Sequence, residues 1–152
     1  MNKVAMVVIV SLSLLLTPAG GKSANIEAEK FLEYSGNETL CETETAHLDT
    51  YAIQVQNNPK YTAYIIVYGG RYGTARHEIK QRRARIRRYL VNNRNIEPER
   101  VRVVNGGFRE KVTVELWLVA PREKLPKPTP TVLLKDVKYK RTKLQFTCSS
   151  FY

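Results

Sequence analysis

The pattern of hydrophobic and polar positions is most distinctive between residues 64 and 90. Residues 64–68 form an uninterrupted apolar run, rich in β-branched side chains, which is followed by Gly69 and Gly70. Such a run bounded by glycine predicts a strand buried on both faces, as in a sheet that other elements cover. We therefore expect residues 64–68 to form the central strand of the fold.

An amphipathic helix is predicted directly after this strand, over residues 75–90. Gly69, Gly70 and Gly73 are expected to form a tight turn, and Thr74 stands where an N-cap is preferred. The apolar positions of the helix cover about a third of its circumference, the width of a stripe that faces a core. These positions are Ala75, Ile79, Ile86, Tyr89 and Leu90. The helix should therefore pack on the sheet.

One basic residue interrupts this apolar stripe. Arg82 lies in the same angular sector as Ile79 and Ile86. A guanidinium in that position must extend to solvent, pair with a carboxylate or contact a ligand, because burying it unpaired is costly. Arg82 is therefore either a structural residue or a ligand contact.

The remaining elements predict a two-layer fold. A weak strand pattern within residues 25–34 precedes a helix pattern over residues 40–56, and strand patterns cover residues 101–104 and 112–119, with a turn signal at 105–107. The order is β-α-β-α-β-β. It predicts an α/β (α+β) two-layer sandwich, with a mixed four-stranded sheet and two helices on one face.

The two ends of the chain differ from the domain between them, which we expect over residues 25–119. Residues 1–21 combine a short basic start, an apolar run and a small-residue stretch, which predicts a cleaved signal peptide; an uncleaved anchor is the alternative. The prolines of residues 120–130 predict a stiff linker, and residues 131–152 predict a basic tail that packs back on the domain. We expect an exported bacterial protein of the periplasm or cell envelope, without stable membrane insertion.

The charge balance narrows the range of partners. The 152 residues carry a formal net charge of +11, which becomes +10 if Lys3 is lost with the signal. Anionic partners are therefore expected: nucleic acid, an anionic polymer of the envelope, or a membrane surface. Export argues against nucleic acid.

Two cysteines, Cys41 and Cys148, are present in a chain that should meet an oxidising compartment. A disulfide between them is the simplest interpretation, and closing a loop of about a hundred residues contributes on the order of 4 kcal/mol in the chain-entropy description. The alternative is a buried Cys41 and a free Cys148.

Catalytic and metal-binding patterns are not evident in the sequence. His47 and His77 are the only histidines, and each is isolated from other potential metal ligands. No phosphate-binding loop or catalytic triad pattern is visible either. We expect a protein that is not an enzyme and that uses no metal or cofactor.

Residues 31–119 resemble the OmpA-like domain, the peptidoglycan-associating module of outer-membrane protein A and its relatives. The matching stretches are residues 48–52 with Asn58 and Pro59, residues 65–70, Arg82 with Ile86 and residues 89–91, residues 96–101, Gly106 with Gly107, and residues 114–116. The resemblance implies a domain that binds the diaminopimelate side chain of peptidoglycan through a loop aspartate and a helix arginine.

The loop that would carry the aspartate reads Gly70-Arg71-Tyr72-Gly73, so this chain has an arginine near that place instead. The helix arginine of the family corresponds to Arg82 or to Arg83. A site of this kind can still bind a carboxylate group of a ligand through its arginines. The resemblance thus implies a ligand site formed by Gly69, Gly70, Arg71, Tyr72, Arg82 and Arg83.

Two functions follow from these patterns. The first is a non-catalytic domain that binds an anionic envelope polymer, with peptidoglycan favoured. The second is an envelope scaffold or assembly protein that has kept the fold, has lost peptidoglycan binding and engages an envelope protein through its C-terminal tail.

Overall fold

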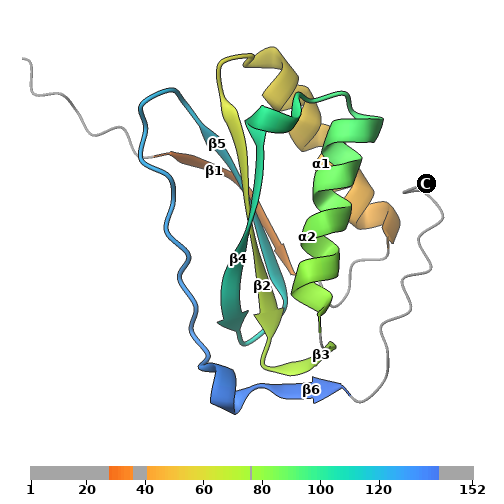
Figure 1. Ribbon diagram of the computed structural model, residues 1–152, viewed down its shortest axis with the longest axis vertical. Helices are drawn as coiled ribbons and strands as arrows, with labels where there is room; N and C mark the ends of the chain where they lie inside the picture. Colours follow the sequence, from red (N-terminus) through yellow and green to blue (C-terminus); the bar gives the residue numbers. More distant parts are fainter. Residues whose placement is uncertain (1–27, 36–40, 76, 141–152) are drawn as a thin grey trace, which may run out of the picture.

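A mixed four-stranded sheet forms the centre of the protein. The computed structural model describes residues 28–35, 41–75 and 77–140. The strands are β1 (Glu29–Ser35), β2 (Thr62–Gly70), β4 (Val101–Arg109) and β5 (Thr113–Val119), in the order β1-β5-β2-β4. β2 runs parallel to β4 and antiparallel to β5, which also pairs antiparallel with β1 (Figure 1). The predicted fold class and the central position of β2 are confirmed.

Both helices lie on one face of this sheet, as predicted (Figure 1). They are α1 (Cys41–Asn57) and α2 (Glu78–Arg88), and α2 continues into a π-helical turn, Tyr89–Asn93. Because side chains alternate along a strand, every second residue of β2 faces the helices. Ala63, Ile65 and Val67 of β2 are fully buried there, within a core that includes apolar side chains of α1 and α2.

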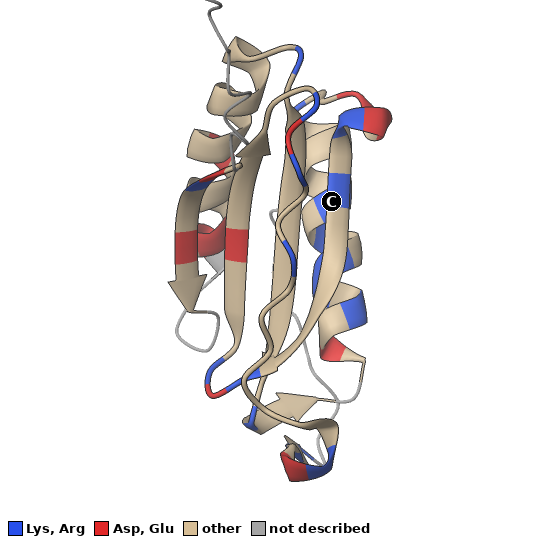
Figure 2. Cartoon of the chain, turned by 90° about the vertical axis from the view of Figure 1, so that its left-hand side faces the viewer, with Lys and Arg blue, Asp and Glu red and all other residues tan. Residues whose placement is uncertain are grey.

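The opposite face of the sheet is covered by an extended segment, residues 120–132, which we call the strap. Figure 2 shows it crossing the sheet on the side away from the helices. Tyr64, Ile66 and Tyr68 form a second buried cluster on this face. The backbone N–H groups of Thr131 and Val132 donate to the Phe108 carbonyl, at 2.9 and 3.0 Å. These bonds fix the end of the strap to β4.

After the strap, the chain forms a short second sheet. A 3₁₀ turn, Leu134–Asp136, leads into β6 (Lys138–Lys140), which pairs in parallel with β3 (Tyr72–Ala75). The Lys138 N–H donates to the Arg71 carbonyl at 2.7 Å. Residues 133–140 therefore contact the loop that follows the central strand.

The predicted start of the second helix was wrong. Thr74 is in β3 and does not cap α2; its hydroxyl accepts from the Gly70 N–H at 2.7 Å and donates to the Gly70 carbonyl at 2.9 Å. α2 begins only at Glu78, whose carboxylate accepts from the Ala75 N–H at 2.8 Å. The pairing of β3 with β6 prevails over the local helix signal of these residues.

The turn predicted at residues 105–107 was also wrong, because these residues lie within β4. Gly106 lies beside the Tyr68 ring, and a Cβ added there would be 2.5 Å from ring carbons. Gly107 has φ +83, next to a shift in the register between β2 and β4. The two glycines therefore allow a close approach and a bulge within the strand.

Three predictions lie wholly or partly outside the described residues. They are the signal peptide, residues 141–152 of the predicted tail, and the disulfide, because neither the side chain of Cys41 nor Cys148 is described. Within the described part of the chain, α1 and α2 are the longest helices, and neither they nor any shorter one is long and apolar enough to cross a membrane.

Candidate functional site

The glycines and the aromatic residue of the predicted site lie at the end of the central strand. Gly69 and Gly70 are the last residues of β2, and both are buried. A Cβ on Gly69 would be 2.7 Å from the Phe108 ring, so this glycine allows the ring to pack over the strand. Tyr72 is 61% exposed at the start of β3. The glycines thus contribute to packing here, whereas Tyr72 presents its side chain to solvent.

Arg82 is buried and paired with a carboxylate. Its side chain is 5% exposed, and its Nε lies 3.1 Å from Oε1 of Glu44, a residue of α1. Arg85 forms an ion pair with the other oxygen of Glu44, and the Tyr34 hydroxyl donates to this carboxylate at 3.3 Å. Of the alternatives open for Arg82, the structure shows pairing with a carboxylate inside the protein.

The other two arginines of the predicted site face different partners. Arg71 forms a salt bridge with Glu110, with 2.8 Å between the charged atoms. Arg83 donates from Nε and Nη2 to the Val103 carbonyl of β4, at 3.1 and 2.9 Å. Because the partners of Arg71, Arg82 and Arg83 lie in different parts of the fold, the structure does not bring these three guanidinium groups around one ligand.

Some basic side chains of the described residues are paired with carboxylates, and others are not. Six arginines form salt bridges with carboxylates. These are Arg71, Arg82, Arg85, Arg94, Arg100 and Arg109. Many other basic residues have no salt bridge with any described residue, and five of them lie on α2 and β4. We call these five residues the basic face; they are Lys80, Arg83, Arg87, Arg88 and Arg102.

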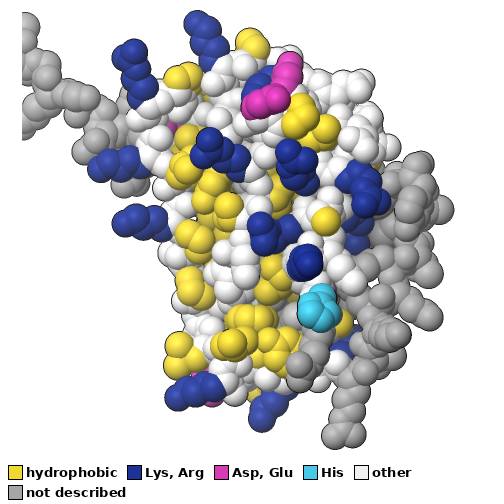
Figure 3. Space-filling view, in the orientation of Figure 1, with side chains coloured by type: hydrophobic (Ala, Val, Ile, Leu, Met, Phe, Trp, Pro, Cys, Tyr) yellow, Lys and Arg dark blue, Asp and Glu magenta, His cyan; other side chains and the backbone are white. Residues whose placement is uncertain are grey.

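The basic face combines α2 with its neighbouring strand. Four of its residues are on α2, and Arg102 is on β4. All are exposed except Arg83, which is half-buried. Figure 3 shows basic side chains gathered over these elements, with acidic ones confined to the margins of this view. No described carboxylate forms a salt bridge with these five side chains, so this surface carries a concentration of positive charge.

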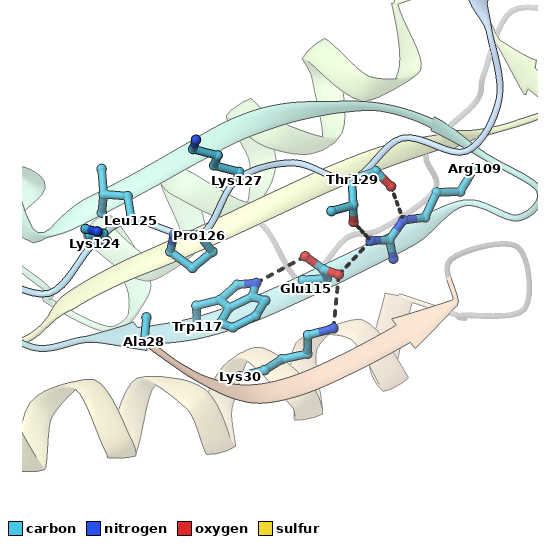
Figure 4. Close-up of a pocket in the computed structure, with 10 residues that line it drawn as sticks. All are labelled: Ala28, Lys30, Arg109, Glu115, Trp117, Lys124, Leu125, Pro126, Lys127 and Thr129. Atoms are coloured by element: carbon cyan, nitrogen blue, oxygen red, sulfur yellow. Dashed lines mark hydrogen bonds and ion pairs between the residues drawn. The ribbon is translucent and has the colours of Figure 1, made fainter. Parts of the chain in front are cut away.

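A pocket of about 470 Å³ lies on the other side of the sheet, between β5, β1 and the strap. Figure 4 shows Trp117 and Glu115 of β5 beside Lys30 of β1, with Pro126 and Lys127 of the strap over them. We call it the strap pocket. Its lining residues are Ala28, Lys30, Arg109, Glu115, Trp117, Lys124, Leu125, Pro126, Lys127 and Thr129.

Glu115 organises the charges of the strap pocket. It is 2% exposed, and its Oε1 is 3.1 Å from Lys30 and 2.8 Å from Arg109. Its Oε2 accepts from the Trp117 Nε1–H at 3.1 Å and from the Tyr68 hydroxyl at 3.3 Å. Each oxygen therefore already has two hydrogen-bond donors.

The pKa of Glu115 is lowered from its ordinary value of 4.5. Burial raises this pKa, but hydrogen bonds from Lys30, Arg109 and Trp117 have the opposite effect and prevail. The ionised carboxylate holds the two cations in place.

Arg109 connects the sheet to the strap. Its guanidinium lies 3.8 Å from the centre of the Tyr68 ring, and its Nη2 donates to the Thr129 hydroxyl at 2.7 Å. It also forms a salt bridge with Glu33, which lies opposite Glu115 in the register of β1 and β5 (Figure 2). Lys30 and Arg109 thus offset the repulsion between two adjacent carboxylates.

Sequence reasoning missed the strap pocket, because its residues lie between Ala28 and Thr129 in the chain. The one available signal was Glu115 in the middle of an apolar strand, since a carboxylate there needs basic partners. In the described part of the chain, no group of three or more His, Cys, Asp or Glu residues could hold a metal ion.

No protein-family model matches this chain, and no curated protein matches it either. The resemblance to the OmpA-like domain therefore rests on the residues quoted above, and it enters the function only as a proposal.

Proposed function

We propose that this chain is an exported, non-catalytic OmpA-like domain that binds an anionic polymer of the cell envelope, with peptidoglycan favoured. The observation that carries the proposal is the basic face. Its five basic side chains share one surface of α2 and β4 and lack carboxylate partners among the described residues. A surface of this kind attracts a polymer with repeated negative charges.

Arginine suits the carboxylates of such a polymer. A guanidinium offers several N–H donors in one plane and can bind a carboxylate through two parallel hydrogen bonds. Arg87, Arg88 and Arg102 are exposed, so their donors can reach a ligand. Arg82 is occupied by Glu44. Binding in this chain would therefore use the outer side of α2 and β4 in place of a buried helix arginine.

The test is the retention of the purified protein on isolated peptidoglycan sacculi at low salt. The triple variant R87A/R88A/R102A should lose most of the retention. A matched control, K135A/K138A/K140A, removes the same number of charges from exposed positions outside the basic face, and it should be retained like the wild type. Absence of wild-type retention at low salt would refute the proposal. Equal losses of retention in both variants would show that binding depends on the net charge of the protein and not on the basic face.

A second function, an envelope scaffold, is favoured by a different observation. Exposed apolar side chains gather where β3 and β6 meet: Tyr72, Leu133, Leu134 and Tyr139 are 61, 64, 65 and 38% exposed. Exposed patches of this kind often contact other proteins. A photo-crosslinking residue at position 133 should then capture one defined envelope protein in cells, and the same residue at exposed position 53 should not.

A further inference from the structure

The strap pocket is a formed cavity on the face of the sheet opposite the helices, separate from the basic face. Its volume of about 470 Å³ falls within the ~300–1,000 Å³ typical of small-molecule sites. One wall is the sheet, with its position fixed by the Glu115 network, and the other is the proline-rich strap. A stiff strap fixed to β4 through Phe108 presents the cavity before a ligand arrives.

The charge of the pocket selects an anion. Four basic side chains and one carboxylate line it, which gives a net charge of +3. Lys30 and Arg109 are engaged by Glu115. Lys124 and Lys127 of the strap are exposed and have no salt bridge with a described residue. Both side chains are flexible and start from the strap at the edge of the pocket (Figure 4), so their ammonium groups can turn toward a carboxylate of the ligand.

The other walls of the pocket select a ring with mixed polarity. Trp117, Leu125 and Pro126 form an apolar side, which suits the C–H face of a sugar ring. Thr129, Lys30 and Arg109 lie along the polar side (Figure 4). Their hydroxyl and N–H groups bond to one another and to Glu115, and the donors that they have left, such as the Thr129 hydroxyl and the third N–H of Lys30, can bond the hydroxyl and amide groups of a sugar.

We propose that the strap pocket binds one carboxylate-bearing amino sugar of a glycan, with the carboxylate at Lys124 and Lys127 and the ring against Trp117 and Pro126. The choice of sugar rests on the proposed function, since such units are part of peptidoglycan. The pocket would then hold a single acidic unit while the basic face attracts the polymer as a whole.

Trp117 is the only tryptophan in the chain, so its fluorescence reports directly on the pocket. Titration of the purified protein with N-acetylmuramic acid should give a saturable change in this fluorescence. N-acetylglucosamine, which lacks the carboxylate, and lactate, which lacks the ring, should each bind at least about tenfold more weakly, a factor that corresponds to the loss of one charge-assisted contact. Equal responses to all three compounds, or none, would overturn the proposal.

The double variant K124A/K127A should bind N-acetylmuramic acid about tenfold more weakly, with an unchanged thermal midpoint because both side chains are exposed. The matched control K135A/K138A should bind like the wild type. Retention on sacculi together with no Trp117 response would remove the pocket proposal and leave the proposed function intact. A saturable Trp117 response without sacculus retention would refute the proposed function and leave the pocket proposal intact. The pocket would then bind a free acidic sugar.

Discussion

Glu44 and Glu115 are buried carboxylates that each pair with two basic side chains, on opposite faces of the sheet. Glu44 lies between Arg82 and Arg85 on the helix face, and it is 1% exposed. Glu115 lies between Lys30 and Arg109 on the strap face. Removing one partner of such a cluster is costly because the remaining charges stay buried. These two carboxylates are therefore the residues at which a single substitution should affect stability most.

Replacing Glu44 with glutamine should lower the free energy of unfolding by about 3 kcal/mol, because two arginines would keep their charge in a buried site without a counter-ion. Urea denaturation measures this change. The control is Glu42→Gln, an exposed position on the same helix, which should change the free energy by less than about 0.5 kcal/mol. Similar losses in the two variants would contradict a structural role for the Arg82–Glu44–Arg85 cluster.

The stability that Glu115 contributes should depend on pH. Its pKa is lower in the folded state than its ordinary value of 4.5, so the unfolded chain takes up a proton first as the pH falls. The stabilisation by the ionised Glu115 carboxylate is therefore fully present above the ordinary pKa of 4.5. It is lost as the pH falls through the lower pKa of the folded state.

Thermal unfolding of the wild type and of Glu115→Gln at a series of pH values checks this expectation. The wild type should be more stable at neutral pH, and the difference should shrink in acid. Glu99→Gln, at an exposed position, should show no such trend. A difference between wild type and Glu115→Gln that stays constant across the series would show that the charge of Glu115 does not stabilise the fold.

At the scale of the elements, the sequence predicts best where periodicity extends over many residues. α1, β2 and β5 lie close to the predicted positions because their apolar patterns match the buried faces. The errors occur at glycine and threonine. The local pattern predicts a helix cap at Thr74 and a turn at Gly106, whereas Thr74 lies in a strand and Gly106 adjoins the Tyr68 ring. Both depend on a partner distant in sequence, which local patterns do not contain.

The strap is the element whose role was least visible in the sequence, and Val132 is its main apolar anchor. Val132 is 5% exposed, and its neighbour Leu133 is 64% exposed. Val132→Ala should lower the free energy of unfolding by about 2 kcal/mol, because it removes buried methyl groups. Leu133→Ala should change it by less than about 0.5 kcal/mol.

Fluorescence of the single tryptophan gives a second measurement on the same pair of variants. If the strap loosens, water reaches Trp117 and its emission should shift to longer wavelength in Val132→Ala alone. An unchanged stability and an unchanged emission in Val132→Ala would show that the strap is not held at this point.

At the scale of the whole molecule, the sheet separates two chemically different sides. The helix side carries the basic face on its outer surface, and the strap side carries the strap pocket. The sequence predicted the layers and the excess of positive charge, but it could not show which cations are neutralised. Arg82 with Glu44 and Arg109 with Glu115 are pairs that only the packing of separate elements creates.

This layering predicts an order of hydrogen exchange across the molecule. β2 pairs with β4 and β5 and is covered by helices on one face and by the strap side on the other, so its amides should exchange only when the whole domain unfolds. All three residues of β6 are exposed, and β6 belongs to a two-stranded sheet. Its amides should exchange by local opening.

Amide exchange followed by NMR at several low urea concentrations separates the two cases. Rates in β2 should rise steeply with urea because global unfolding exposes much surface, whereas rates in β6 should hardly change. Parallel slopes for β2 and β6 would mean that the second sheet unfolds only with the first. The loop after the central strand, which β6 contacts through Arg71 and Tyr72, would then be as rigid as the core, and a partner at that end would meet a preformed surface.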